Sequence, residues 1–502
     1  MFSRISPALL AFGGSIVLLG ALISALVWTG GADRQSHSHE PLTVYCAEAM
    51  RVPLTAIAAD YEKEFKQKVI LHFGPSQTIL ATMKLTQTGD LFLPADASYV
   101  GDARKDNVVT DVLNICTMRA VIIVHPKLPR TIATWDDFMA SNNKIGLAEP
   151  KATAIGKITK VHLGNAGLWD RVQERQPTFM GNVNEVCNAV RLGSVDVGIV
   201  WDVTAQPHSE LKQIHLKELE NVSARVQVAV TKFSKHPADA LRFARFIRAK
   251  DKGAIHLKAQ GYSNIEEGEA MDARPELVIY AGAMLRPALE QSLTEFEKRE
   301  NCKIVRVYNG CGILVSQMKT GDMPDVYFAC DTSFMTQVKD SFGNPVNVSN
   351  NQLMITVKKG NPKQVFTLKD LGKPDLRVGV GHEQQCALGA LTKETFLLKG
   401  VYADIAKNIK VQSPSGDALV NQLRVGSLDV VVAYRSNISQ FADELEGIPI
   451  TDVKCATPSQ PIAVSKNSAH PDLSRRLTEY LLRAESRDRF EKLGFGWDVT
   501  EK

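Results

Sequence analysis

The apolar and polar positions of the chain follow a pattern that occurs twice, starting at Leu42 and again at Leu277. Each copy opens with a short apolar run, residues 42–45 or 277–280, followed by small residues. A helical pattern of apolar positions then continues to Phe65 in one copy and to Glu300 in the other. The pattern predicts a buried strand, a tight turn and a helix that begins at the turn. In α/β sheets, ligands collect at this end of the strands, where helix N-termini present free N–H groups.

The match between the two copies extends well beyond their openings. Further segments correspond at offsets of 233 to 235 residues: 72–77 with 307–312, 89–96 with 324–331, and 191–201 with 424–434. Two copies of about 220 residues are much larger than solenoid repeats, so they indicate a domain duplication. We therefore predict domains at residues 42–263 and 276–502, joined by a charged linker at residues 264–275.

Within each copy, short apolar strands alternate with helical patterns, as at residues 121–124, 144–147 and 197–200. Such alternation favours an α/β sheet covered by helices. Since about 220 residues is generous for one sheet, we predict two lobes per copy with a ligand cleft between them. The predicted strands crossing between lobes are residues 116–124 and 225–230 in the first copy, and 351–357 and 460–464 in the second. A long helical pattern, 237–259 or 471–493, closes each copy.

The N-terminal 41 residues differ from the rest of the chain. Residues 5–29 carry no charge, and the 21 residues from Ala8 to Trp28 are almost wholly apolar. As a helix this run would be about 31 Å long, enough to cross a bilayer, whereas a secretory signal usually has a shorter apolar region. We expect an uncleaved membrane anchor and a polar tether, with a cleaved signal peptide as the alternative. Either way, residues 42–502 are expected to lie outside the cytoplasmic membrane, in the periplasm or its extracytoplasmic equivalent.

Composition and motifs exclude several classes of function. The net charge of +4, without a Lys/Arg-rich block, does not indicate a nucleic-acid surface. The eight cysteines form no close CxxC pair, so no zinc site is predicted, and most are expected to be buried free thiols with room for one disulfide bridge. The GxSxG, HExxH and P-loop motifs are absent. We therefore predict a protein that is not an enzyme and that has no cofactor.

Several motifs, met in the same order in both copies, carry a resemblance to a known family. They are Phe73-Gly-Pro-Ser76, then residues 89–96, 146–156 and 193–201 in the first copy, and residues 376–389 and 426–434 in the second. Over nearly all of residues 42–500, both copies resemble the periplasmic molybdate-binding proteins of ABC importers. The resemblance implies tandem type II periplasmic-binding-protein domains. Each would have two hinged α/β lobes that hold molybdate or tungstate for an ABC permease and its ATPase.

The resemblance assigns ligand contacts to five positions in each copy. They are Ala49, Ser76, Ile155, Val183 and Trp201 in the first copy, and Met284, Cys311, Leu388, Gly416 and Tyr434 in the second. The family's two serines fall on the first two positions of each set, two backbone N–H donors on the next two, and a tyrosine on the last. Only Ser76 and Tyr434 keep the family's hydroxyl group. The loss of one charge-assisted hydrogen bond weakens binding by about 10- to 150-fold.

Other residues leave alternatives open. Arg51 and Arg286 occupy matched positions in the first turn of the opening helix, where they could contact the ligand, latch the cleft or point into solvent. Ser415 could replace the hydroxyl missing at Met284.

Asp96 and Asp331 end their strands and are expected to cap the following helices. Met284, Cys311, Cys330 and Cys386 gather near the second predicted cleft, so a soft-metal binder is one alternative function. The other is a membrane-anchored sensor or scaffold that uses the same fold without transport.

Overall fold

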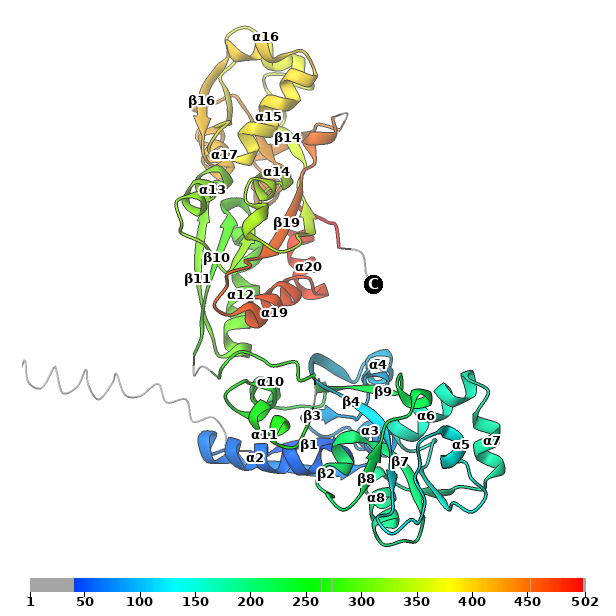
Figure 1. The fold of residues 1–502 in the computed structure, drawn as a ribbon. Coiled ribbons are helices and arrows are strands. Elements are labelled where there is room, and N and C mark those ends of the chain that lie inside the picture. Colours follow the sequence, from blue (N-terminus) through cyan, green and yellow to red (C-terminus); the bar gives the residue numbers. More distant parts are fainter. Residues whose placement is uncertain (1–39, 263, 272–273, 452, 500–502) are drawn as a thin grey trace, which may run out of the picture.

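The computed structural model describes residues 40–262, 264–271, 274–451 and 453–499, which form two tandem α/β domains of two lobes each (Figure 1). The fold predicted from the sequence is therefore confirmed. The predicted anchor at residues 5–29 lies outside the described residues. Within the described ranges, no helix is long and apolar enough to cross a membrane.

In the first domain, one nine-stranded sheet runs through both lobes in the order β2-β1-β3-β9-β4-β7-β5-β6, with β8 paired to β4. The strand β4 joins the lobes, because its first part pairs with β9 and residues 120–124 pair with β7. The crossing predicted at residues 116–124 is therefore confirmed. The strands are β1 (Leu42–Ala47), β2 (Val69–Gly74), β3 (Leu91–Leu93), β4 (Val109–Val124), β5 (Ile145–Ala148), β6 (Thr178–Met180), β7 (Val197–Trp201), β8 (Lys212–Ile214) and β9 (Ser223–Thr231).

The second domain has a separate sheet in each lobe, in the orders β11-β10-β12-β19-β13-β20 and β16-β15-β17-β14-β18. The long strand of the first domain is here divided into β13 and β14, and the buried Asn351 between them bonds to Ser436 through its Nδ2, 2.7 Å from Oγ. The strands are β10 (Glu276–Gly282), β11 (Lys303–Asn309), β12 (Val326–Phe328), β13 (Val346–Asn350), β14 (Leu353–Lys358), β15 (Val378–Gly381), β16 (Ile409–Ser413), β17 (Val430–Tyr434), β18 (Leu445–Pro449), β19 (Ser459–Val464) and β20 (Gly496–Trp497).

Helices cover both faces of these sheets. In the first domain they are α2 (Arg51–Phe65), α3 (Ser76–Thr86), α4 (Ala97–Lys105), α5 (Trp135–Phe138), α6 (Ala154–Asn165), α7 (Trp169–Glu174), α8 (Val183–Arg191), α9 (Asp202–Ala205), α10 (Pro237–Arg248) and α11 (Gly253–Ala259). In the second they are α12 (Arg286–Glu300), α13 (Cys311–Lys319), α14 (Thr332–Thr336), α15 (Ala387–Leu398), α16 (Tyr402–Ala406), α17 (Gly416–Arg424), α18 (Arg435–Ile438), α19 (Pro471–Leu481) and α20 (Ala484–Lys492).

The helical pattern that closes each copy forms two helices rather than one. Ala249 after α10 and Arg483 before α20 adopt extended backbone conformations, with ψ of 130° and 163°. These residues interrupt the helical hydrogen bonds and turn the chain, so that α11 can pack against α2 and α20 against α12. Apolar periodicity continues across such a break, because each of the two helices still buries one face, α10 against β9 and α11 against α2.

The two domains meet through charged side chains, with α10 of the first domain packed against α12 of the second (Figure 1). Glu300 at the end of α12 is 2% exposed and pairs with Arg245 from α10, at 2.8 Å, and with Arg476 from α19, at 3.2 Å. Asp111 in β4 pairs with Arg299 and Arg483 of the second domain. Buried ion pairs of this kind fix one orientation of the packed helices only when every charge has a partner.

The described residues of the predicted linker pack against the first domain. Gly268 donates its backbone N–H to Arg248 O at 2.8 Å, and Glu266 donates to Ile115 O at 2.9 Å. The carboxylate of Glu269 then accepts backbone N–H bonds from the start of α19 in the second domain. This segment therefore adds contacts to the interface between the domains.

Candidate functional site

A cavity lies between the lobes of the first domain, at the carboxyl ends of β1 and β2. It is a small cleft, open to solvent on one side, with about 270 Å³ of space between the protein atoms and the opening. The N-termini of three helices, α3, α6 and α8, reach its wall. All five positions that the resemblance assigns in this copy line it: Ala49, Ser76, Ile155, Val183 and Trp201.

A matching cavity of about 340 Å³ lies between the lobes of the second domain. The starts of α13, α15 and α17 reach its wall in the same arrangement. Four of the five assigned positions line it, namely Met284, Leu388, Gly416 and Tyr434, together with Ser415. The fifth, Cys311, is fully buried behind the wall, and Cys330 faces the cavity in its place.

The helix ends of the two cavities differ in how their N–H groups are satisfied. In the first domain, Thr153 Oγ1 accepts the N–H of Gly156 and Asn182 Oδ1 accepts the N–H of Glu185, each near 3 Å. In the second domain, the corresponding residues Cys386 and Ser415 form no side-chain cap. Each helix N-terminus carries about half a positive charge. The second cavity therefore has more helix N–H groups that lack a side-chain acceptor and could bind an anion.

The two hydroxyl groups that the sequence retains have different surroundings. The Oγ of Ser76 accepts the backbone N–H of Ala95 at 3.1 Å, which leaves its own proton free to be donated. Tyr434 is 2% exposed, and within the described chain its hydroxyl has no hydrogen-bond partner. Burial, followed by the charges of Asp331 and Cys386, raises the pKa of Tyr434 well above its usual value. The Tyr434 hydroxyl is therefore a neutral donor, and leaving it unpaired is costly.

A disulfide replaces the serine contact in the second domain. Cys311 at the start of α13 is bonded to Cys330, which follows β12, and Cys330 donates its N–H to Cys311 Sγ at 3.1 Å. These positions correspond to Ser76 and Ala95, which form the matching hydrogen bond in the first domain. A Cβ at Gly282 would collide with Cys330 Sγ, which explains why glycine stands where the first copy has alanine. The other six cysteines are free, and five of them are buried.

The two matched arginines lie outside both cavities. Arg51 donates to both carboxylate oxygens of Glu48, at 2.7 and 2.9 Å, and its guanidinium lies 4.2 Å from the ring centroid of Phe73. Arg286 is about two-thirds exposed and lies 3.7 Å from Glu290. The capping aspartates behave as predicted, because Asp96 and Asp331 accept N–H bonds from Ser98 and Ser333.

Sequence reasoning missed the polar residues at the cavity mouths. Glu48 lines the first cavity, and its Oε1 accepts a hydrogen bond across the cleft from Asn184 Nδ2 at 3.3 Å. Asn309, Asp417 and Asn437 line the second cavity. Their only signal in the sequence is that they differ between matched positions of the two copies.

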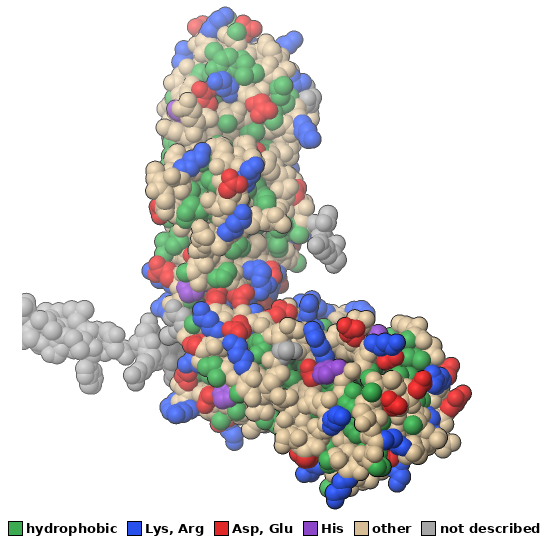
Figure 2. Space-filling model, in the orientation of Figure 1, with side chains coloured by type: hydrophobic (Ala, Val, Ile, Leu, Met, Phe, Trp, Pro, Cys, Tyr) green, Lys and Arg blue, Asp and Glu red, His purple; other side chains and the backbone are tan. Residues whose placement is uncertain are grey.

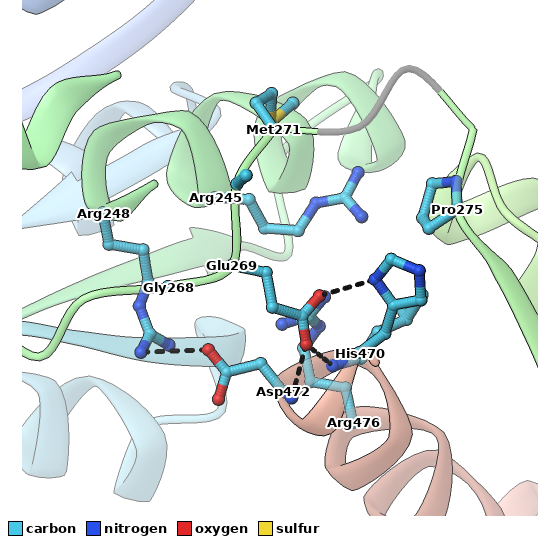
Figure 3. Close-up of a pocket in the computed structure, with 11 residues that line it drawn as sticks. Arg245, Arg248, Gly268, Glu269, Met271, Pro275, His470, Asp472 and Arg476 are labelled. Atoms are coloured by element: carbon cyan, nitrogen blue, oxygen red, sulfur yellow. Dashed lines mark hydrogen bonds and ion pairs between the residues drawn. The ribbon is translucent and has the colours of Figure 1, made fainter. Parts of the chain in front are cut away.

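A third cavity lies between the domains, but its charges are already paired (Figure 3). Glu269 faces His470 at 3.6 Å and also accepts the N–H of Asp472 at 2.6 Å. Arg248 pairs with the Asp472 carboxylate at 3.2 Å, and Arg476 pairs with Glu300. This cavity belongs to the interface between the domains and offers no unpaired charge to a ligand.

Metal ligands give no other site among the described residues, and the one face drawn in Figure 2 shows no patch of a single charge. On the face that Figure 2 shows, basic and acidic side chains are interspersed and gather where the domains meet. No group of three or more His, Cys, Asp or Glu side chains in the described ranges could hold a metal ion. The soft-metal alternative also loses two thiols, because Cys311 and Cys330 are joined in a disulfide.

Comparison with known proteins agrees with the duplicated architecture. The family model described as "Bacterial extracellular solute-binding protein" matches twice, over residues 42–263 and 277–496. The molybdate-binding protein ModA of Mycobacterium bovis is 24% identical over 248 residues, which is 48% of this chain and 92% of that protein.

Solved structures that resemble the chain have the size of one of its domains. The periplasmic molybdate-binding protein of Azotobacter vinelandii is 19% identical, with a TM-score of 0.39, and covers 44% of this chain and 98% of its own. The sulfate-binding protein SubI of Mycobacterium tuberculosis is 14% identical, with a TM-score of 0.38, and covers 44% of this chain and 86% of its own.

Proposed function

The chain belongs to the family of bacterial extracellular solute-binding proteins, and on this premise we propose that it captures a small oxyanion for an ABC importer. The proposed ligand is molybdate, which the name of the Mycobacterium bovis relative mentions, or the related tungstate. The proposed partners are an ABC permease and its ATPase. The proposed location is the periplasm or its extracytoplasmic equivalent, with residues 5–29 as an anchor or a signal peptide.

The observation that carries the proposal is the convergence of three helix N-termini on each interlobe cavity. An oxyanion gives up strong hydration when it enters a cleft, so the protein must supply hydrogen-bond donors in return. Backbone N–H groups at helix ends do this without a paired cation. The unpartnered Tyr434 hydroxyl in the second cavity adds a donor that an oxyanion oxygen would satisfy.

The relation of the lobes supports a closing mechanism. In the first domain, Gln77 N–H of one lobe donates to Ala152 O of the other at 3.2 Å, so the lobes touch directly across the cleft. A ligand that contacts both lobes stabilises the closed form over the open one, and closure is the change that a permease can detect.

Removal of the Tyr434 hydroxyl tests the second cleft. We expect Tyr434→Phe to weaken oxyanion binding there by about 10- to 150-fold, since one charge-assisted hydrogen bond is lost. Isothermal titration with molybdate, tungstate, phosphate and arsenate measures the effect for whichever oxyanion this cleft prefers. Tyr327→Phe is the matched control, because the Tyr327 hydroxyl is also buried and unpartnered but does not line the cavity. Equal affinity in both variants would contradict the assigned role of Tyr434.

Removal of the Ser76 hydroxyl tests the first cleft. We expect Ser76→Ala to weaken binding there by about 10-fold or more, while the second cleft is unaffected. Trp201 lines the first cavity and is 1% exposed, so the fluorescence change that is lost in Trp201→Phe on titration reports this cleft. A thermal-shift panel of the unmodified protein accompanies the titration, because a ligand at 100 times its Kd adds about 2.7 kcal/mol of stability. If no oxyanion shifts the melting temperature, the proposed function is wrong.

A further inference from the structure

The mouths of the two clefts carry different pairs of residues at matched positions. In the first domain the pair is Glu48, which lines the cavity, and Asn184 of the other lobe, which bonds to Glu48 without lining the cavity itself. In the second domain the corresponding residues are Ala283 and Asp417, both of which line the cavity. Each cleft therefore has one carboxylate, but the two carboxylates come from opposite lobes and have different partners.

The carboxylate of the first cleft is paired with a cation within the protein. Both oxygens of Glu48 accept hydrogen bonds from Arg51, and Oε1 also accepts one from Asn184. The paired guanidinium neutralises its charge. A ligand in this cleft therefore meets donors, such as the Ser76 hydroxyl, and a carboxylate whose charge is already compensated.

The carboxylate of the second cleft has no such compensation. Asp417 accepts one hydrogen bond, from Asn437 Nδ2 at 2.7 Å, and within the described part of the chain it pairs with no cation. Asn437 Oδ1 in turn accepts the backbone N–H of Tyr434 at 3.0 Å. These bonds fix Asp417 relative to the backbone of Tyr434, and both residues line the cavity, where Asp417 is an acceptor and the unpartnered Tyr434 hydroxyl is a donor.

A carboxylate without a paired cation, placed beside an anion site, distinguishes oxyanions that carry a proton from those that do not. It repels an oxyanion that carries no proton, but it accepts a charge-assisted hydrogen bond from one that keeps an O–H group. Phosphate and arsenate keep a proton at neutral pH, whereas molybdate, tungstate and sulfate do not. The uncapped starts of α15 and α17 and the Tyr434 hydroxyl would bind the remaining oxygens.

We infer that the second cleft takes a protonated oxyanion, of the hydrogenphosphate and hydrogenarsenate class, whereas the first takes an unprotonated one of the molybdate class. The inference rests on the proposed function and assigns a ligand class to each of its clefts. The duplication would thus give one chain two ligand classes.

The test separates the clefts with matched blocking variants. Ala49 and Met284 occupy corresponding positions and line the two cavities, so Ala49→Trp fills the first cleft and Met284→Trp the second. Isothermal titration of each variant uses molybdate, sulfate, phosphate and arsenate at neutral pH. With the first cleft blocked, we expect phosphate to bind at least tenfold more tightly than molybdate. With the second cleft blocked, we expect the reverse order.

The role of Asp417 in the ligand preference of the second cleft is tested in the Ala49→Trp background. Adding Asp417→Asn is expected to weaken phosphate binding and strengthen molybdate binding, each by about tenfold, because Asp417 is exposed and its charge is screened. Asn184→Asp, the converse change in the first cleft, is the comparison variant and should weaken molybdate binding to the Met284→Trp protein.

Three outcomes would overturn the inference. Preference for molybdate at both clefts, or an unchanged order after Asp417→Asn, would overturn it while leaving the proposed function intact. Binding of no oxyanion at either cleft would overturn both. Circular dichroism and the melting temperature of each variant show that it is folded, and a second blocking variant, Ala283→Trp, replaces Met284→Trp if that protein does not fold.

Discussion

Replacing Glu300 with alanine is expected to lower the free energy of unfolding by about 3–5 kcal/mol. The Glu300 carboxylate is almost fully buried where the domains meet, with Arg245 of the first domain at 2.8 Å and Arg476 of the second at 3.2 Å. Its removal leaves two largely buried guanidinium groups without their counter-charge, and an unpaired buried charge is more expensive than the pair is favourable.

The pH dependence of stability provides a second measure of the same group. Burial alone would raise the pKa of Glu300, but the charges of Arg476 and Arg245 outweigh burial and hold it below the ordinary glutamate value. A lowered pKa in the folded state means that Glu300 stabilises the protein above its unfolded-state pKa. This contribution is lost as the pH falls through the folded-state pKa. The difference in free energy of unfolding between the original protein and Glu300→Ala should therefore become smaller as the pH is lowered into the acidic range.

Urea unfolding and calorimetry measure both effects. Glu479→Ala is the control, because Glu479 is 57% exposed and pairs with Arg475 at the surface, where ion pairs contribute about 0–1 kcal/mol. We expect the Glu300 variant to unfold in two separated steps, since the domains then lose the central buried ion pair of their interface. A loss no larger than that of Glu479→Ala would show that the interface does not depend on this triad.

The local elements of the fold could be predicted from the sequence because each is encoded by nearby residues. The strand, turn and helix that start at Leu42 and Leu277 follow from apolar periodicity and small residues, and both helices end at a left-handed residue, Lys66 or Asn301. The break between α10 and α11 was not predicted, since the apolar pattern continues through it. The docking of residues 264–271 on the first domain was also not predicted. Its hydrogen bonds join backbone atoms to those of Ile115 and Arg248, so no side-chain pattern in the sequence indicates them.

At the candidate sites, the sequence predicted which positions line the cavities but not the disulfide or the side-chain contacts. Nine of the ten assigned positions line the two cavities, because order and spacing along the chain place them at matching strand ends. Their role in binding remains a prediction. The position of Cys311 behind the cavity wall depends on its bond to Cys330, and with eight cysteines the pairing could not be read from spacing. The partners of Glu48 and Asp417, which are Arg51 and Asn184 for one and Asn437 for the other, were not predicted, because they depend on side-chain orientation.

The double variant Cys311→Ser, Cys330→Ala should destabilise the second domain and strengthen its oxyanion site at the same time. The disulfide joins residues 19 positions apart, and its removal is expected to cost about 3 kcal/mol by the loop-closure entropy of the unfolded chain. The substitutions reproduce the Ser76 and Ala95 pair of the first domain. The new hydroxyl would accept the backbone N–H of residue 330 and donate its own proton into the cavity.

This pair of opposite effects separates the structural role of the disulfide from its effect on ligand binding. Urea unfolding is expected to show the loss of stability, and titration of the Ala49→Trp background with phosphate and molybdate should show at least tenfold tighter binding of the preferred oxyanion. The original protein in excess dithiothreitol is the control, since reduction removes the cross-link without adding a hydroxyl. It should show the loss of stability alone. If reduction by itself tightened binding to the same extent, the gain would come from a more mobile cleft wall, and the missing hydroxyl would not be what limits the second cleft.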